Sequence, residues 1–258
     1  MLVACTQRGT SSPVAPEDAS VIPSADGSVP TSGGCDAAGQ SVVQFQTDDG
    51  VTLSGDLHRT GKSGGPAVVL LHMIPPSNDR KNYPASFISA LVDRGMTVLN
   101  VDRRGAGASG GVARDAYTGA KAALDGKAAI AFLRGHACSF DAERLAVVGA
   151  SNGTTTALDY AVTAAKPPRA LVFLTGGAYT ENQTKLADQH AKLDVVPILF
   201  VYSTAENAWS KGFVPSAPPQ WVFKEYANGA HGTGMFAAEP RSVDDVASFL
   251  ATNLSPSP

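Results

Sequence analysis

The chain has 258 residues, of which 43% are hydrophobic, and a formal net charge of −3. This length and composition suit one catalytic domain with a single large core. The small net charge, without a long run of Lys or Arg, excludes an electrostatic surface for nucleic acid, and no run of about 18 apolar residues is present to span a bilayer.

The N-terminal segment has the composition of a tether. Residues 6–39 are rich in Ser, Pro, Gly, Thr and Ala and bury too little surface to offset the entropy of ordering. Before them, Leu2-Val3-Ala4-Cys5 resembles the lipobox of bacterial lipoproteins, although only Met1 precedes it, without the remaining parts of a signal peptide. We expect residues 1–39 to be a disordered or extended tether, lipidated at Cys5, that attaches an extracytoplasmic catalytic domain, residues 40–258, to a membrane.

Two further cysteines are Cys35, just before the first predicted strand, and Cys138, in a loop ahead of the strand that ends at Gly149. In an oxidising compartment this pair can close a disulfide that ties the tether to the domain. Two unpaired thiols fit the sequence almost equally well, and both alternatives stay open.

The domain opens with a predicted antiparallel hairpin. Residues 42–47 and 51–58 alternate apolar and polar side chains around Asp48-Asp49-Gly50. After it, apolar runs typical of strands buried on both faces alternate with segments of helical spacing, which indicates a mostly parallel sheet with helices on both faces. The predicted strands are 67–71, 97–101, 145–149, 170–175, 197–203 and 221–226, and the predicted helices are 84–94, 117–134, 152–165, 181–193 and 243–254.

The pentapeptide Gly149-Ala150-Ser151-Asn152-Gly153 stands between a predicted strand and a predicted helix. A serine attacks an ester carbonyl well when it stands clear of the backbone on a tight turn, and that turn crowds the residues two positions away, where this chain has glycine. Alone, the motif favours an ordinary Gly-rich turn. The flanking elements favour Ser151 as a nucleophile.

Four motifs occur in a set order along the chain. They are Leu70-Leu71-His72-Met73, the run from Asp102 to Gly110, the pentapeptide around Ser151, and Gly229-Ala230-His231-Gly232. In this order they resemble the α/β-hydrolase family and, within it, the dienelactone-hydrolase-like and carboxylesterase branch. The resemblance covers about residues 42–254 and implies an eight-stranded sheet, a triad in the order Ser, acid, His, and a structural role for the run from Asp102 to Gly110.

The base is predicted to be His231, because it follows the last strand and has glycine neighbours that let an imidazole approach a serine. Solvated or structural roles suit the other histidines better. The resemblance places the acid just beyond strand 197–203, which is the position of Glu206. The rivals Asp188 and Asp194 precede that strand and so lie toward the wrong end of the sheet. The histidines set aside are His58, His72, His136 and His190.

An oxyanion hole needs two backbone donors. One is the amide of Asn152, at the start of the helix. The other must come from the loop after strand 67–71, where Pro75 and Pro76 have no N–H, so that Met73 is favoured over Ile74.

The connection between 175 and 197 is too short for a large cap domain, so the pocket should be open. Its predicted apolar lining favours uncharged esters with small or medium acyl chains as substrates. The predicted pocket residues are His72, Ile74, Tyr83, Trp209, Phe213 and Met235, with Met73 and Phe236 beside them.

The sequence therefore predicts a monomeric serine hydrolase of carboxylic esters that uses no cofactor and no metal, since no His, Asp or Cys pair has ligand spacing. Its partner is a small-molecule ester. Two alternatives stay open: a peptidase or amidase with the same triad, and a surface-anchored binding protein that keeps the fold without catalysis.

Overall fold

The computed structural model describes residues 37–136, 141, 143–179 and 185–256. The predictions for Cys5, Cys35 and Cys138, and for most of the tether, fall outside these residues and stay predictions. Within the described residues, no helix is long and apolar enough to cross a membrane.

The described residues form one eight-stranded sheet in the order β1-β2-β4-β3-β5-β6-β7-β8. The pairs β1/β2 and β2/β4 are antiparallel, and every later pair is parallel, which confirms the predicted architecture. The strands are β1 (Ala38–Gln46), β2 (Thr52–Thr60), β3 (Ala67–Leu71), β4 (Thr97–Asp102), β5 (Leu145–Ala150), β6 (Ala170–Leu174), β7 (Ile198–Ser203) and β8 (Trp221–Tyr226).

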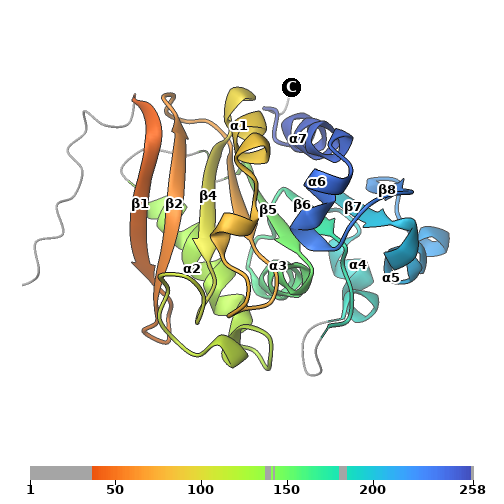
Figure 1. The fold of residues 1–258 in the computed structure, drawn as a ribbon, viewed down its shortest axis with the longest axis horizontal. Helices are drawn as coiled ribbons and strands as arrows, with labels where there is room; N and C mark the ends of the chain where they lie inside the picture. Colours follow the sequence, from red (N-terminus) through yellow and green to blue (C-terminus); the bar gives the residue numbers. More distant parts are fainter. Residues whose placement is uncertain (1–36, 137–140, 142, 180–184, 257–258) are drawn as a thin grey trace, which may run out of the picture. The chain divides into compact units, whose positions relative to one another are not determined.

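The central strands are apolar because helices cover both of their faces. Successive side chains of a strand point to opposite faces, so Val69 and Leu71 belong to one core and Val68 and Leu70 to the other. The first core includes side chains of α2 (Ala122–Gly135) and α3 (Asn152–Thr163), and the second includes those of α1 (Ala85–Asp93) and α7 (Arg241–Asn253). Figure 1 shows α2 near α3, and α1 near α7.

The remaining helical turns are short and lie in the connections. Those after β6, β7 and β8 sit at the carboxyl ends of the strands, where parallel sheets place their sites, and none of the described connections carries a large cap. They are η2 (Arg80–Asn82), η3 (Ala113–Ala116), η4 (Leu186–Gln189), α4 (His190–Leu193), η5 (Thr204–Glu206), α5 (Ala208–Lys211), η6 (Val214–Ser216), η7 (Gly232–Gly234) and α6 (Met235–Ala238).

Two predicted helices differ from the structure. The helix predicted over 117–134 begins only at Ala122, because Gly119 has a left-handed φ of 68° that a helix cannot continue through. The helix predicted over 181–193 is described only from Leu186, where a 3₁₀ turn precedes the single turn of α4. The other predicted elements agree with the structure to within a few residues.

Strand register sets the position of Ser151. Leu71 at the end of β3 pairs with Gly149, and Ala150 at the end of β5 pairs with Leu174 of β6. The loops after β3, β5 and β6 therefore leave the sheet side by side, and Ser151 stands between the other two.

Candidate active site

Ser151 occupies a strained turn between β5 and α3. Its φ of 50° and ψ of −123° lie where a residue with a side chain is rarely found. A Cβ built on Gly149 would lie 2.5 Å from the Gly153 carbonyl oxygen, and one built on Gly153 would lie 2.3 Å from the Leu71 carbonyl oxygen. Both flanking positions therefore admit only glycine, as the crowding of the turn predicts.

Three side chains join in one chain of hydrogen bonds. The Ser151 hydroxyl lies 2.6 Å from Nε2 of His231, and Nδ1 of His231 lies 3.0 and 3.1 Å from the two carboxylate oxygens of Glu206. A neutral imidazole protonated on Nδ1 satisfies both contacts: Nδ1–H donates to Glu206, and Nε2 accepts from the serine hydroxyl. The structure thus brings together the three residues predicted as nucleophile, base and acid.

Glu206 lies on η5, directly beyond the carboxyl end of β7. Its side chain is 41% exposed and that of His231 is 43% exposed, so this pair faces solvent while Ser151 is buried. Asp188 and Asp194, the rival acids, both precede β7 in the chain.

The loop that carries His231 is fastened to the end of β6. The Gly232 N–H donates to the Thr175 hydroxyl over 2.7 Å, and the Thr175 N–H donates to the Val201 carbonyl over 2.7 Å. Thr175 itself has a φ of 48°, unusual for a β-branched residue. Sequence reasoning missed Thr175. The Gly176-Gly177 pair after it was the available signal that the chain turns tightly there.

His72 orders the loop after β3, the structural role considered for it, and is not among the residues that line the pocket described below. It is fully buried; Nδ1–H donates to the Met73 carbonyl over 2.7 Å, and Nε2 accepts from the Arg103 N–H over 2.9 Å. Burial, together with the nearby Arg103 charge, lowers the pKa of His72 to about 3. The ring is therefore neutral and engaged at both nitrogens.

Arg103 connects the two segments predicted to supply the oxyanion donors. Its buried guanidinium donates to the carbonyls of His72 and Met73 over 3.2 Å each, and to the side chains of Asn152 and Thr156 over 2.9 and 2.7 Å. Burial lowers the pKa of Arg103 to about 10, so it stays protonated at neutral pH. These hydrogen bonds show how one residue of the run from Asp102 to Gly110 plays the structural role expected for that run.

The backbone amides of Met73 and Asn152 stay available to a ligand. In the described part of the chain, neither N–H donates to a protein acceptor. The Met73 side chain lies beside the nucleophile, since a Cβ built on Gly232 would lie 2.3 Å from Met73 Sδ and 3.7 Å from Ser151 Cβ.

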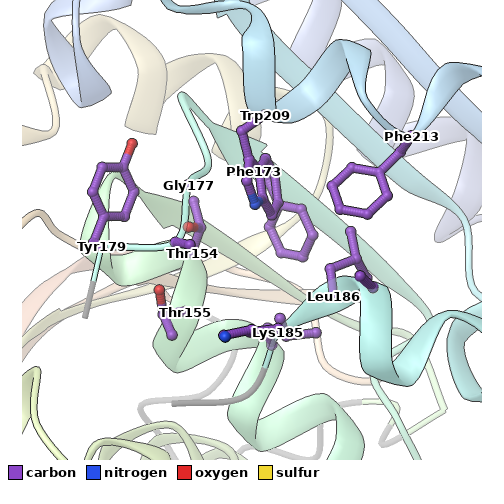
Figure 2. A pocket seen from close by; sticks show the side chains of 12 residues that line it. Thr154, Thr155, Phe173, Gly177, Tyr179, Lys185, Leu186, Trp209 and Phe213 are labelled. Atoms are coloured by element: carbon purple, nitrogen blue, oxygen red, sulfur yellow. The ribbon is translucent and has the colours of Figure 1, made fainter. Parts of the chain in front are cut away.

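A cavity of about 210 Å³, the aromatic pocket, is lined by residues that contact Ser151 and His231 (Figure 2). Thr154, on its wall, donates its hydroxyl to the Ser151 carbonyl over 2.6 Å, and the Tyr179 ring meets the His231 ring edge-on at 5.9 Å. The pocket is lined by Thr154, Thr155, Leu158, Phe173, Gly177, Ala178, Tyr179, Lys185, Leu186, Ala187, Trp209 and Phe213.

Of the predicted pocket residues, Trp209 and Phe213 line this cavity. Tyr83 and Met235 do not, because both are core residues: Tyr83 donates its hydroxyl to the carbonyls at the ends of β3 and β5, and Met235 is fully buried. Phe236, also in the core, stacks on Phe87, and Ile74 is 38% exposed on the loop after β3. The sequence did not predict the pocket residues of α3 and of the loop after β6, because only the order of the strands in the sheet brings these two segments together.

Among the described residues, no group of three His, Cys, Asp or Glu side chains could hold a metal ion.

The strand order and the elbow at Ser151 define an α/β hydrolase. Residues 49–211 match the family model of the X-Pro dipeptidyl-peptidase (S15 family), and the chain belongs to this family of α/β hydrolases. No curated protein matches the chain.

Solved structures share the fold at low identity. The esterase Pf2001 of Pyrococcus furiosus is 21% identical, with a TM-score of 0.64 over 85% of this chain and 95% of that chain. A dienelactone hydrolase-like promiscuous phosphotriesterase, P91, from metagenomic libraries is 19% identical, with a TM-score of 0.61 over 84% and 99%. Dienelactone hydrolase from Anabaena variabilis is 15% identical, with a TM-score of 0.61 over 83% and 96%.

Proposed function

We propose that this hydrolase cleaves carboxylic esters through an acyl-enzyme intermediate on Ser151. The observation that carries the proposal is the 2.6 Å contact between the Ser151 hydroxyl and Nε2 of His231 on a strained elbow. A hydroxyl that stands clear of the backbone, and whose proton can pass to a neutral imidazole, is an activated nucleophile.

The proposed reaction has two halves. His231 takes the Ser151 proton through Nε2 as the oxygen attacks the ester carbonyl, and it then gives that proton to the leaving alcohol. Water, deprotonated by the same imidazole, attacks the acyl-enzyme and releases the acid. Glu206 holds the imidazole in the required tautomer and stabilises its protonated form.

Charge on the attacked oxygen is proposed to be stabilised by the amides of Met73 and Asn152. Arg103 fixes the position of both segments, so the donors need not reorganise as charge develops. Donors of this kind stabilise a transition state more than a ground state.

Uncharged esters suit the aromatic pocket because its walls are mainly apolar. The pocket volume of about 210 Å³ favours small or medium groups over long chains.

The family match makes amide or peptide cleavage the second candidate. Release of an N-terminal dipeptide requires recognition of a free ammonium group, for which a carboxylate is the natural partner. Among the described residues that line the aromatic pocket, the one charged side chain is that of Lys185, a cation. This charge favours esters over peptides with a free N-terminus.

A fluorophosphonate probe tests the proposal. We expect one adduct, located on Ser151 by peptide mass spectrometry and absent from Ser151→Ala. The matched control is Ser89→Ala, an exposed serine on α1, which should label like the wild type. A binding protein without catalysis would give no adduct, and comparison of matched ester and anilide substrates separates esterase from amidase.

A further inference from the structure

Aromatic rings form one side of the aromatic pocket, and their arrangement is specific. Trp209 meets Phe213 at a centroid distance of 5.0 Å and 75° between planes, and meets Phe173 at 6.2 Å and 65°. Figure 2 shows these three rings beside one another, facing Thr154 and Thr155 across the cavity. Edge-to-face surfaces of this kind attract a further ring beyond the gain from burial alone.

The rings lie close to the backbone only because glycines follow Thr175. A Cβ built on Gly176 would lie 2.4 Å from the Trp209 indole, and one built on Gly177 would lie 2.8 Å from the Tyr179 ring. The two glycines of the loop after β6 therefore make room for the Trp209 ring at Gly176 and for the Tyr179 ring at Gly177.

The volume matches one ring and little more. An apolar cavity of about 150 Å³ holds benzene. The aromatic pocket, at about 210 Å³, has room for a six-membered ring with one or two further carbons. Leu158 and Phe173, both almost fully buried, close its inner end against an extended chain.

The wall of the pocket reaches the proposed base through Tyr179. The Tyr179 hydroxyl donates to the Thr175 carbonyl, and its ring packs against the His231 ring. Burial raises the pKa of Tyr179 to about 12, so the phenol stays neutral and adds no charge to this wall.

We propose that the substrate is an ester with a single aromatic ring one carbon from the ester group, and that the aromatic pocket holds this ring. The proposal rests on the proposed function. The ring can belong to the acid, as in a phenylacetate ester, or to the alcohol, as in benzyl acetate.

Matched esters test the ring. Ethyl phenylacetate is compared with ethyl cyclohexylacetate, which has a saturated ring of similar size, and with ethyl octanoate, which has the same number of acyl carbons. Benzyl acetate is compared with cyclohexylmethyl acetate. We expect kcat/KM for the aromatic ester of at least one pair to exceed its saturated partner by about three- to tenfold.

Three variants connect this preference to the pocket. Trp209→Leu should abolish the preference for the aromatic ring, and Leu158→Phe should lower kcat/KM for the preferred aromatic ester about tenfold by filling the pocket. The matched control is Phe132→Leu, which removes a ring that stacks on Phe45 at 5.0 Å, away from the pocket. It should keep the preference.

Binding to Ser151→Ala separates this proposal from the proposed function. The chain has two tryptophans, and we expect the preferred aromatic ester to change the fluorescence of Ser151→Ala but not of the Ser151→Ala, Trp209→Leu double variant. If the aromatic ester bound but the wild type did not hydrolyse it, the ring-binding site would be supported and the proposed esterase activity would be contradicted. Equal turnover of the octanoate and the aromatic ester, unaffected by Trp209→Leu and Leu158→Phe, would overturn the ring site and leave the esterase.

Discussion

The guanidinium of Arg103 donates to the side-chain oxygen of Asn152 over 2.9 Å, and the same guanidinium contacts the Met73 carbonyl. The loop after β3 and the first residue of α3 are thereby held at one cation. No carboxylate of the described residues forms an ion pair with Arg103. The buried guanidinium therefore lies next to both segments proposed to supply the oxyanion donors, with Asp125 and Asp159 near enough to interact with it electrostatically.

This contact predicts that stability and turnover move in opposite directions in Asn152→Asp. The new carboxylate would pair with Arg103 and remove the Asn152 Nδ2 group, a buried donor without a partner among the described residues, so the free energy of unfolding should rise by about 1 kcal/mol. Turnover should fall about 100-fold because a negative charge next to the proposed oxyanion opposes it. Urea denaturation and ester kinetics measure the two effects.

Asn152→Ala is the control for this prediction, since it removes the acceptor without adding charge and should lower stability instead. An Asn152→Asp variant with wild-type kcat would show that a negative charge at position 152 does not oppose the reaction, which contradicts the proposed oxyanion site.

The proposed acid makes a separate prediction. Glu206→Gln keeps the size of the side chain but loses the charge that stabilises the His231 imidazolium, so kcat should fall about 10⁴-fold with little change in KM. Glu225→Gln serves as the control, because Glu225 is also exposed and contacts Asn207 near the same loop but not His231. If both variants turned over ester at similar rates, Glu206 would not be the acid.

The elbow predicts a steep cost at Gly153. In Gly153→Ala the new methyl would lie 2.3 Å from the Leu71 carbonyl oxygen, so β3 and α3 must move apart. We expect a loss of about 3 kcal/mol in the free energy of unfolding, measured by denaturant titration. Gly135→Ala, where nothing lies within 4 Å of the added carbon, should stay within about 1 kcal/mol of the wild type. Equal stabilities for the two variants would contradict the geometry of the turn.

Acid sensitivity is predicted from Asp49. Its hydrogen bonds to Arg104, and secondarily to Thr47, lower its pKa from 3.8 to about 2. Because the folded pKa is the lower one, the stabilisation is present above the unfolded pKa and is lost as the pH falls toward 2. The free energy of unfolding of the wild type should therefore drop between about pH 4 and pH 2, and that of Asp49→Asn should drop less.

Asp48→Asn is the matched control for the acid titration, because Asp48 pairs with Lys127 where both side chains are about 60% exposed, and such pairs contribute little. It should follow the wild-type curve. If the free energy of unfolding of Asp49→Asn fell with pH as steeply as that of the wild type, the contact with Arg104 would not be the cause of the loss of stability in acid.

Sequence reasoning reached the strands of the sheet and two of the three hydrogen-bonded side chains, Ser151 and His231, because these follow from local signals. Runs such as Val68 to Leu71 are apolar on both faces of a central strand, and glycines mark Ser151 and His231. Glu206 required the family resemblance, since nothing in its neighbourhood distinguishes it from other exposed carboxylates.

What could not be predicted depends on contacts between distant segments. An arginine beside Asp102 is expected at a surface, yet Arg103 is buried and reaches His72 and Asn152, which lie 31 and 49 residues away. Tyr83 was assigned to a pocket by its nearness in sequence, whereas it lies between η2 and α1 with its side chain in the core, where its hydroxyl contacts the carbonyls of Leu71 and Val148. Thr175 looked like the end of a strand, and its hold on Gly232 appears only once the sheet is assembled.

The most direct test of the esterase is to trap the acyl-enzyme. The protein is mixed with excess 4-nitrophenyl acetate, quenched in acid within the first turnovers, digested and analysed by mass spectrometry. We expect an acetyl group on Ser151, formed together with a burst of 4-nitrophenol and absent from both Ser151→Ala and His231→Ala. Ester turnover with no acetyl group on Ser151 and no burst, or turnover that persists in Ser151→Ala, would contradict the account.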